Sequence, residues 1–262
     1  MKQTKSSFRV LQSALICALS IALLSGCAGN KIRREVEKGI AKVLPEKIGP
    51  AKSYDVKVWA STMKILDGKL DSVDIVGKDV KLPNGLKLAE LDVTVKDIRF
   101  DPRSREVKSC GETTYSATLS EEELGLYLKR TFPDVPALAV DLKTDRIGVA
   151  ASPSMTGIRV NIKAEATLDI EKQRFLTLGL RKVTVAGVPT PGFARDYIAT
   201  KVNPVFDADE IGFDAKISSA KIKDEAVTLT GDLNLMKALA GDKPAKPDQT
   251  MPKAPHPEDK VN

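Results

Sequence analysis

The cysteine with the clearest chemical role is Cys27, which ends the sequence Leu24-Ser25-Gly26-Cys27. An apolar run from Ala14 to Leu24 leads into it, and the residues before that run include Lys2, Lys5 and Arg9. A basic start, a short apolar segment and small residues are typical of a secretory signal. A cysteine placed directly after the small pair matches the bacterial lipobox. We therefore expect cleavage before Cys27 and transfer of acyl chains to the new N-terminal residue.

The length of the apolar run supports this interpretation, because a spanning helix needs about 20 apolar residues. Two or more acyl chains anchor a protein stably, whereas one chain holds it only marginally. We expect residues 1–26 to be a lipoprotein signal peptide and the mature protein to be extracytoplasmic, lipid-anchored to the cell membrane or outer membrane. Ala28, rather than aspartate, follows the cysteine. By resemblance to the sorting rule of bacteria with two membranes, this favours the outer membrane.

Other residues that commonly carry catalysis are scarce. Cys17 lies in the signal peptide, so Cys110 is the only cysteine besides the acylated one, and the mature chain has no internal disulfide. The single histidine, His256, lies in a tail over residues 241–262 that contains five prolines and is expected to be disordered. These positions argue against Ser-His and Cys-His catalysis and against zinc sites built from histidine or cysteine.

Carboxylates offer two further candidates. Glu121-Glu122-Glu123 fits the first turn of a helix, where the helix dipole favours acidic side chains. Asp207, Asp209 and Glu210 form an acidic segment, for which a solvated loop is favoured over a weak calcium site. No nucleotide-binding, serine-hydrolase or zinc-protease motif is present. We expect no cofactor, no metal and no enzymatic activity, and the remaining catalytic alternative is a hydrolase that uses carboxylates alone.

The charge and size of the mature chain limit which functions and how many domains are expected. The three basic residues of the signal account for half of the formal net charge of +6. No dense basic cluster with interleaved aromatic residues is present, so nucleic-acid binding is not expected. Residues 27–240 are long enough for one domain with a substantial core.

The elements that would position any site are mostly strands. An amphipathic helix is predicted from Asn30 to Leu44, and Pro45 and Gly49-Pro50 are expected to end it. Two further helices are predicted, one after the Ser120–Glu123 capping box and one from Pro191 to Val202. Apolar and polar residues alternate through the strands that we predict. These cover Tyr54–Val58, Leu70–Ile75, Leu86–Phe100, Thr114–Leu119, Leu138–Leu142, Arg146–Ala151, Gly157–Leu168, Arg174–Val185, Asp214–Lys223 and Ala226–Leu235.

This pattern predicts an α+β fold in which a long curved antiparallel β-sheet, a meander of roughly ten strands, wraps about three amphipathic helices. The interior would be lined by aliphatic side chains, which suit flexible acyl chains better than rings or cations. The same side chains could also simply fill a core, and the pattern favours that alternative when taken alone.

The order of several short motifs resembles the LmeA-like phospholipid-binding family over about residues 31–235. The matching segments are Tyr54–Val58, Ile65–Lys69, Val73–Gly77, Leu86–Phe100, Tyr115–Leu124, Tyr127-Leu128, Val183–Pro189 and Asn203-Pro204. The resemblance implies an extracytoplasmic lipid-binding protein with a TULIP-like fold, in which a curved sheet wraps helices. Some members act in building or maintaining the cell envelope, and the family has no catalytic motif to transfer to this chain.

Two hypotheses follow. In the first, the anchored domain holds phospholipid acyl chains in an apolar cavity and serves in cell-envelope lipid handling. Its expected wall residues are Trp59, Ile65, Leu66, Val73, Ile75, Phe100, Leu124, Tyr127, Leu128 and Ile198. Trp59, the only tryptophan, would lie at the cavity mouth, at the bilayer interface or in the core. In the second, the protein is a structural envelope lipoprotein with a filled core that binds a protein partner through its C-terminal tail.

Overall fold

The structure is a computed structural model that describes residues 29–236 except 105, 132, 134, 136, 153, 156, 157, 212, 213 and 224. The predicted signal peptide, Cys27 and the predicted tail over 241–262 lie outside the described residues. Their assignments, and the domain limits 27–240, therefore stay predictions. No helix in the described part is both long and apolar enough to span a bilayer.

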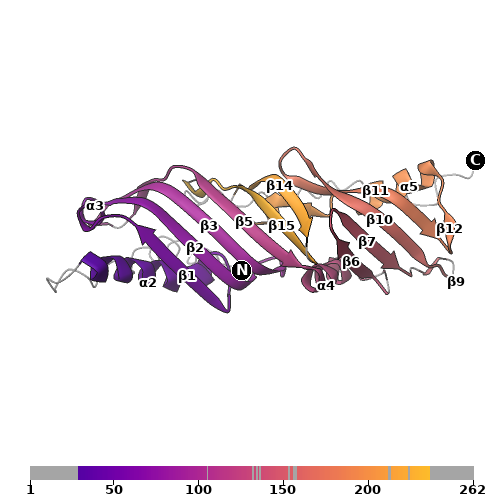
Figure 1. The fold of residues 1–262 in the computed structure, drawn as a ribbon, viewed down its shortest axis with the longest axis horizontal. Coiled ribbons are helices and arrows are strands. Elements are labelled where there is room, and N and C mark those ends of the chain that lie inside the picture. Colours follow the sequence, from indigo (N-terminus) through magenta and orange to yellow (C-terminus); the bar gives the residue numbers. More distant parts are fainter. Residues whose placement is uncertain are drawn as a thin grey trace, which may run out of the picture.

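The described chain is α+β, and the paired strands of the described part are all antiparallel (Figure 1). The helices are α2 (Gly29–Lys47), α3 (Thr62–Leu66), α4 (Glu121–Thr131), α5 (Gly192–Val202) and the 3₁₀ helix η2 (Ala208–Ile211). The strands are β1 (Ser53–Trp59), β2 (Lys69–Lys81), β3 (Lys87–Phe100), β4 (Val107–Ser109), β5 (Thr113–Ser120), β6 (Ala139–Lys143), β7 (Arg146–Ala151), β8 (Ser154–Met155), β9 (Ile158–Arg159), β10 (Ile162–Glu171), β11 (Phe175–Val185), β12 (Val188–Pro189), β13 (Phe206–Asp207), β14 (Lys216–Lys223) and β15 (Ala226–Asp232).

Helix α2 is longer than predicted, because Pro45 lies inside it rather than ending it. Pro45 lacks the N–H that would donate a helical hydrogen bond, but the next turn still closes, because Ile48 N donates to Leu44 O at 2.8 Å. Val36, Val43 and Leu44 are buried, as the apolar stripe predicts. The helix therefore lies along the protein with one face against the sheet.

The first large sheet, here called sheet A, has the strand order β1-β2-β3-β5-β15-β14, with β4 paired to β3. Buried and exposed residues alternate along its strands, so one face is apolar and the other polar. At the centre of the apolar face, Val93 lies opposite Ile75 on β2 and Tyr115 on β5. The apolar face of sheet A is called the inner face below.

The prediction of a single meander is wrong at this sheet. The chain leaves sheet A after β5, builds a second sheet, and returns to place β15 beside β5, where Leu229 lies opposite Ala117. The return covers the free edge of β5, which would otherwise expose unpaired backbone groups. This pairing joins residues more than 100 positions apart, so local periodicity gave no sign of it.

The second large sheet, sheet B, has the order β12-β11-β10-β7-β6, with β13 paired to β11. It follows sheet A end to end along an elongated molecule (Figure 1). Backbone hydrogen bonds join the two: Ile217 N on β14 donates to Gln173 O, and Asp145 N donates to Ile222 O. Leu142, Ile147 and Leu176 of sheet B belong to the same buried apolar cluster as the inner face of sheet A.

The helices also differ from the prediction of about three, since the described part contains four α-helices. The unpredicted one, α3, has five residues and is too short to show an apolar period. Ser61 caps it, because its Oγ accepts from Lys64 N at 3.3 Å. The predicted cap of α4 is confirmed, since Ser120 Oγ accepts from Glu123 N at 3.3 Å. Helix α5 begins and ends within one residue of its prediction.

Candidate functional site

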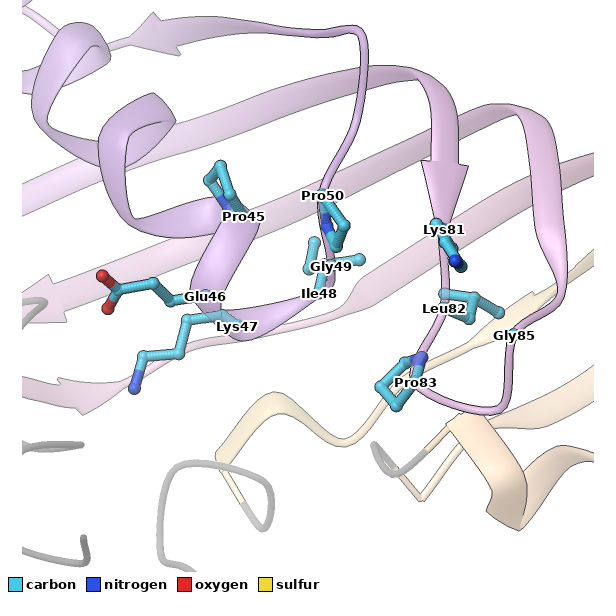
Figure 2. Close-up of a pocket in the computed structure, with 10 residues that line it drawn as sticks. All are labelled: Pro45, Glu46, Lys47, Ile48, Gly49, Pro50, Lys81, Leu82, Pro83 and Gly85. Atoms are coloured by element: carbon cyan, nitrogen blue, oxygen red, sulfur yellow. The ribbon is translucent and has the colours of Figure 1, made fainter.

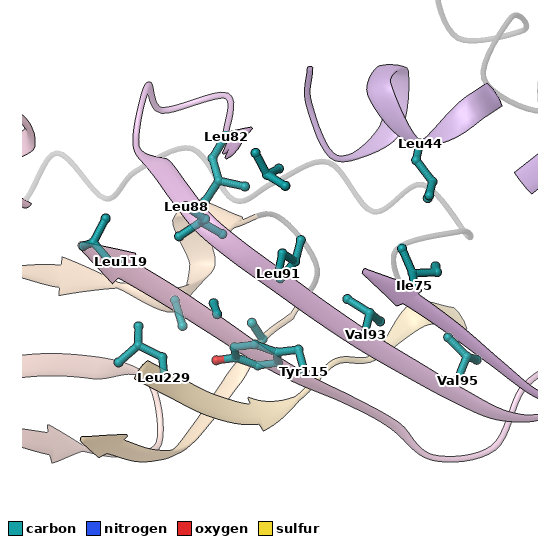
Figure 3. Close-up of a cluster of buried hydrophobic side chains, with 14 of the residues drawn as sticks. Leu44, Ile75, Leu82, Leu88, Leu91, Val93, Val95, Tyr115, Leu119 and Leu229 are labelled. Atoms are coloured by element: carbon teal, nitrogen blue, oxygen red, sulfur yellow. The ribbon is translucent and has the colours of Figure 1, made fainter. Parts of the chain in front are cut away.

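The inner face of sheet A is the candidate site, because it is a broad aliphatic surface with a helix over one end. Figure 3 shows its side chains projecting from neighbouring strands to the same side, with Leu44 of α2 above them. The labelled side chains are Leu44, Ile75, Leu82, Leu88, Leu91, Val93, Val95, Tyr115, Leu119 and Leu229. Among the described helices, α2 packs closely on β1, α3 on β2, and α4 on β5 and β6; none packs as closely on β3 or β15.

The structure places most of the predicted wall residues in, or packed against, the buried apolar cluster that includes the inner face of sheet A. Those that are buried in it are Ile65, Val73, Ile75 and Phe100. Leu124 and Tyr127 of α4 are partly buried and pack against the same cluster. These six residues come from α3, β2, β3 and α4, so the structure brings predicted wall residues from separate elements into one apolar cluster. Their grouping fits both a ligand wall and a filled core.

Four predicted wall residues lie elsewhere. Leu128 is buried but lies outside the main cluster, and Ile198 of α5 is half-buried on sheet B. Trp59 and Leu66 are exposed at the end of sheet A. Trp59 alternates with the buried Val58, so its indole lies on the outer face, where Nε1 donates to Asp74 Oδ2 at 2.6 Å. The core position for Trp59 is therefore wrong.

Two hydroxyl groups on the inner face were missed by the sequence analysis. Thr113 and Tyr115 are buried at successive inward positions of β5, and Figure 3 shows the Tyr115 ring among the aliphatic side chains. Within the described part of the chain, neither Thr113 Oγ1 nor the Tyr115 hydroxyl has a hydrogen-bond partner. Burial raises the pKa of Tyr115 to about 12, so the hydroxyl keeps its proton at neutral pH. Alternation with Ala117 and Leu119 was the available signal for their orientation.

A buried hydroxyl without a partner is costly, because it loses its hydrogen bonds to water and gains none in return, at about 1–3 kcal/mol. Native structures satisfy most such groups, so two adjacent exceptions require an explanation. A ligand with acceptor oxygens beside its apolar part would satisfy both. The ester carbonyls of a glycerolipid have this chemistry.

An open hollow of about 370 Å³ lies at the C-terminal end of α2. Figure 2 shows the end of α2 on one side, the turn between β2 and β3 on the other, and the α2–β1 link between them. Its lining consists of Pro45, Glu46, Lys47, Ile48, Gly49, Pro50, Lys81, Leu82, Pro83 and Gly85. Ile48 and Leu82 also belong to the apolar cluster or pack against it, so the hollow borders the core. Its volume lies at the small end of the roughly 300–1,000 Å³ that is usual for ligand pockets.

Local contacts hold the walls of this hollow in place. Gly49 has a φ of +144°, and a Cβ there would lie 2.0 Å from Lys81 O, so this close approach requires glycine. The Tyr54 hydroxyl donates to Gly49 O at 2.8 Å, and burial raises the pKa of Tyr54 to about 12. On the opposite wall, Arg130 of α4 donates to Gly85 O at 2.7 Å. Helix α4 thereby fixes the β2–β3 turn.

Two acidic residues of the segment 207–210, Asp207 and Asp209, form ion pairs with Arg174. Arg174 donates to Asp207 through Nε at 2.7 Å and Nη2 at 2.6 Å, and Nη2 also lies 2.8 Å from Asp209. Burial alone would raise the pKa of Asp207, but the hydrogen bonds from Arg174 outweigh it and lower that pKa. No cluster of three or more histidine, cysteine or acidic side chains suited to a metal occurs among the described residues.

The glutamates at the start of α4 also have structural contacts. Glu121 Oε2 accepts from Leu142 N at 2.6 Å, which joins α4 to sheet B. Glu123 Oε1 lies 3.4 Å from Lys87 Nζ on β3. These contacts agree with the prediction of helix-start acids rather than a catalytic pair. Cys110 is a free, half-buried thiol.

Comparison with known proteins places most of the chain in one group. A family model described as LmeA-like phospholipid-binding matches residues 28–232. This range contains sheets A and B and helices α2 to α5. Of the described part, it leaves out residues 233–236. Neither the curated proteins nor the solved structures include a significant match to the chain.

Proposed function

The chain belongs to the LmeA-like phospholipid-binding family, and we propose that it is a membrane-anchored extracytoplasmic lipoprotein that holds phospholipid acyl chains against the inner face of sheet A. It binds lipid without catalysis and serves in cell-envelope lipid handling or maintenance. Acylated Cys27 supplies the anchor, and sheets A and B with their helices form a TULIP-like fold.

The observation that carries this proposal is the pair of buried hydroxyls on the inner face. Thr113 and Tyr115 lie among aliphatic side chains and have no partner in the described part of the chain. Acyl chains would pack on the aliphatic residues, while an ester oxygen accepts hydrogen bonds from the hydroxyls. The open hollow beside Leu82 supports a route from solvent to this face, because its lining borders the core.

Mass spectrometry of the full chain, purified from membranes without denaturant, tests the proposal directly. We expect phospholipid to be recovered by solvent extraction in a fixed ratio to protein. Lipid in no more than the amount carried by an unrelated lipoprotein purified in the same way contradicts the proposal.

Replacement of two alanines by phenylalanine, one in each sheet, tests whether the inner face is a lipid-binding wall or part of a filled core. Ala117 lies at the centre of the inner face, and Ala166 is fully buried in sheet B. With Ala117→Phe, the added ring takes up acyl-chain space, so lipid is lost while the fold keeps its stability. Ala166→Phe overpacks a filled region and costs about 1–3 kcal/mol. Equal destabilisation by both substitutions, with lipid content unchanged, contradicts the wall assignment.

The second candidate function is a structural envelope lipoprotein that acts through a protein partner bound by the tail over 241–262. Its support is the burial of Val73, Ile75 and Phe100, which a filled core also produces. Deletion of residues 241–262 tests it. Loss of the cellular function with lipid content intact favours this candidate, whereas retention of function favours lipid binding.

A further inference from the structure

One end of the molecule carries a group of exposed apolar side chains. Six large apolar side chains of the described part are exposed, and three of them, Trp59, Met63 and Leu66, lie within eight residues of one another. Their exposed fractions are 54%, 69% and 44%. They occupy the end of β1 and helix α3, at one extremity of the elongated molecule (Figure 1). These three residues are called the α3 tip below.

The α3 tip is held firmly rather than loosely attached. Ile65, between the exposed residues Met63 and Leu66, is buried in the core cluster and anchors α3. The helix is closed at both ends, by the Ser61 cap and by the hydrogen bond from Gly68 N to Ile65 O at 3.0 Å. Trp59 is fixed through its indole Nε1, which donates to Asp74. A rigid apolar tip loses little conformational entropy when it contacts a partner.

The start of the described chain lies at the same end. Strand β1 runs back along α2, since Val58 N donates to Glu37 Oε1 at 3.0 Å, and α3 contacts α2. Helix α2 begins at Gly29, two residues after Cys27. Figure 1 shows α3 beside the beginning of α2. Whatever holds the chain immediately before Gly29 therefore acts close to the α3 tip.

The first residues of α2 carry positive charge, although a helix favours negative charge at its N-terminus. The first residues of α2 include Lys31, Arg33 and Arg34, and the first turn has no acidic residue. Cations at a helix N-terminus oppose the helix dipole, so a nearby anion would relieve this arrangement. Basic residues beside a membrane attract anionic lipid headgroups, with about 1 kcal/mol for each. Within α3, Lys64 is paired with Asp71 at 2.6 Å, which offsets that carboxylate.

We propose that the α3 tip inserts into the interface of an anionic phospholipid bilayer, with Lys31, Arg33 and Arg34 against the headgroups. Tryptophan and leucine beside basic residues are the composition expected of a segment that lies in the membrane interface. The tip fixes how the domain stands on the membrane. This surface goes beyond the proposed lipid site and does not depend on it, because Trp59 is on the outer face of sheet A.

Trp59 reports on this contact directly, since it is the only tryptophan of the chain. The full chain is reconstituted into vesicles of phosphatidylcholine and phosphatidylglycerol whose acyl chains are brominated. We expect these vesicles to quench Trp59 fluorescence about twofold or more relative to vesicles without bromine. The double substitution Met63→Asp and Leu66→Asp abolishes this quenching.

The matched control is the double substitution Val188→Asp and Phe193→Asp. These residues are exposed at β12 and α5, at the opposite end of the molecule (Figure 1), and their exchange leaves the quenching unchanged. Exchange of Lys31, Arg33 and Arg34 for glutamine reduces quenching on phosphatidylglycerol vesicles and leaves it unchanged on pure phosphatidylcholine. Circular dichroism confirms that each variant is folded.

Absence of quenching in the unmodified chain, or equal quenching in the tip variant, overturns the proposal. The lipid site is judged separately, from the phospholipid that co-purifies with each variant. Failure of the proposed function shows as missing lipid with quenching intact. Failure of the membrane-contacting tip shows as retained lipid without quenching.

Discussion

Replacement of Gly49 by alanine is the sharpest test of how α2 is attached to sheet A. The new Cβ would lie 2.0 Å from Lys81 O, whereas side-chain carbons stay at least about 3.0 Å from such an atom. The α2–β1 link must therefore move by about 1 Å. A φ of +144° in a residue other than glycine adds about 1–3 kcal/mol of strain.

The displacement also affects the bond in which Lys81 N donates to Pro50 O at 2.9 Å, with a net value of about 1 kcal/mol. Together these effects predict a loss of about 2–4 kcal/mol. For a domain of this size, 1 kcal/mol corresponds to about 2–4 °C in the melting temperature, so we expect a fall of about 5–15 °C. The assay is thermal unfolding of the full chain in one detergent, followed by circular dichroism.

Gly125 provides a control with the opposite sign. It lies inside α4, and no atom lies within 4 Å of the position that a Cβ would take. Gly125→Ala should therefore stabilise the protein by about 0.5–1 kcal/mol, because alanine is the better helix former. If the Gly49→Ala variant melts at or above the temperature of the Gly125→Ala variant, Gly49 does not lie so close to Lys81 O. The shape of the hollow that depends on this contact would then also be refuted.

Three further predictions concern single contacts. Tyr115→Phe removes an unpartnered buried hydroxyl that costs about 1–3 kcal/mol, so the lipid-free protein should melt about 2–12 °C higher while the lipid retained on purification falls; a lower melting temperature in the lipid-free state would contradict the absence of a partner for this hydroxyl. Arg174→Gln should cost about 1–2 kcal/mol in urea unfolding, because a bidentate and partly exposed ion pair is lost, and an unchanged midpoint would show that the pair contributes nothing. The lowered pKa of Asp207 means that its stabilisation is full above the unfolded carboxyl value of 3.8 and is lost as the pH falls through the lower folded value. Asp207→Asn should therefore flatten the stability profile below about pH 4, as measured by urea midpoints across that range, and an identical profile would refute the assignment.

Much of the local structure could be predicted from the sequence, because burial on one face of a strand leaves a period of two. Strand β7 has the predicted bounds, Arg146–Ala151; β5 is one residue longer than predicted at each end, and β11 begins one residue later than predicted. The signals at Ser120 and at Asn203-Pro204 likewise placed the start of α4 and the end of α5. Each of these depends on interactions between residues that are close in the chain.

The parts that could not be predicted depend on contacts between distant residues. Strand β15 pairs with β5 although all the strands of sheet B lie between them in the sequence. No local sequence pattern shows which edge of the sheet the returning strand will cover. Helix α3 has only five residues, so it was hidden in the sequence although it carries two of the three residues of the α3 tip. Of the two wall residues predicted in this helix, Ile65 is buried and Leu66 is exposed.

By itself, the sequence determined that Tyr115, Ala117 and Leu119 face one side of the predicted strand Thr114–Leu119, since alternation is a property of the extended backbone. It also determined the family, because the order of short motifs can be read from the sequence without knowledge of the fold. Only the tertiary structure decided that β3 and β15 flank this strand, that the two hydroxyls are buried, and that α3 and the start of α2 share one end of the molecule. The reason is physical: the direction of a side chain follows from its own backbone, whereas its surroundings depend on which distant segments pack against it.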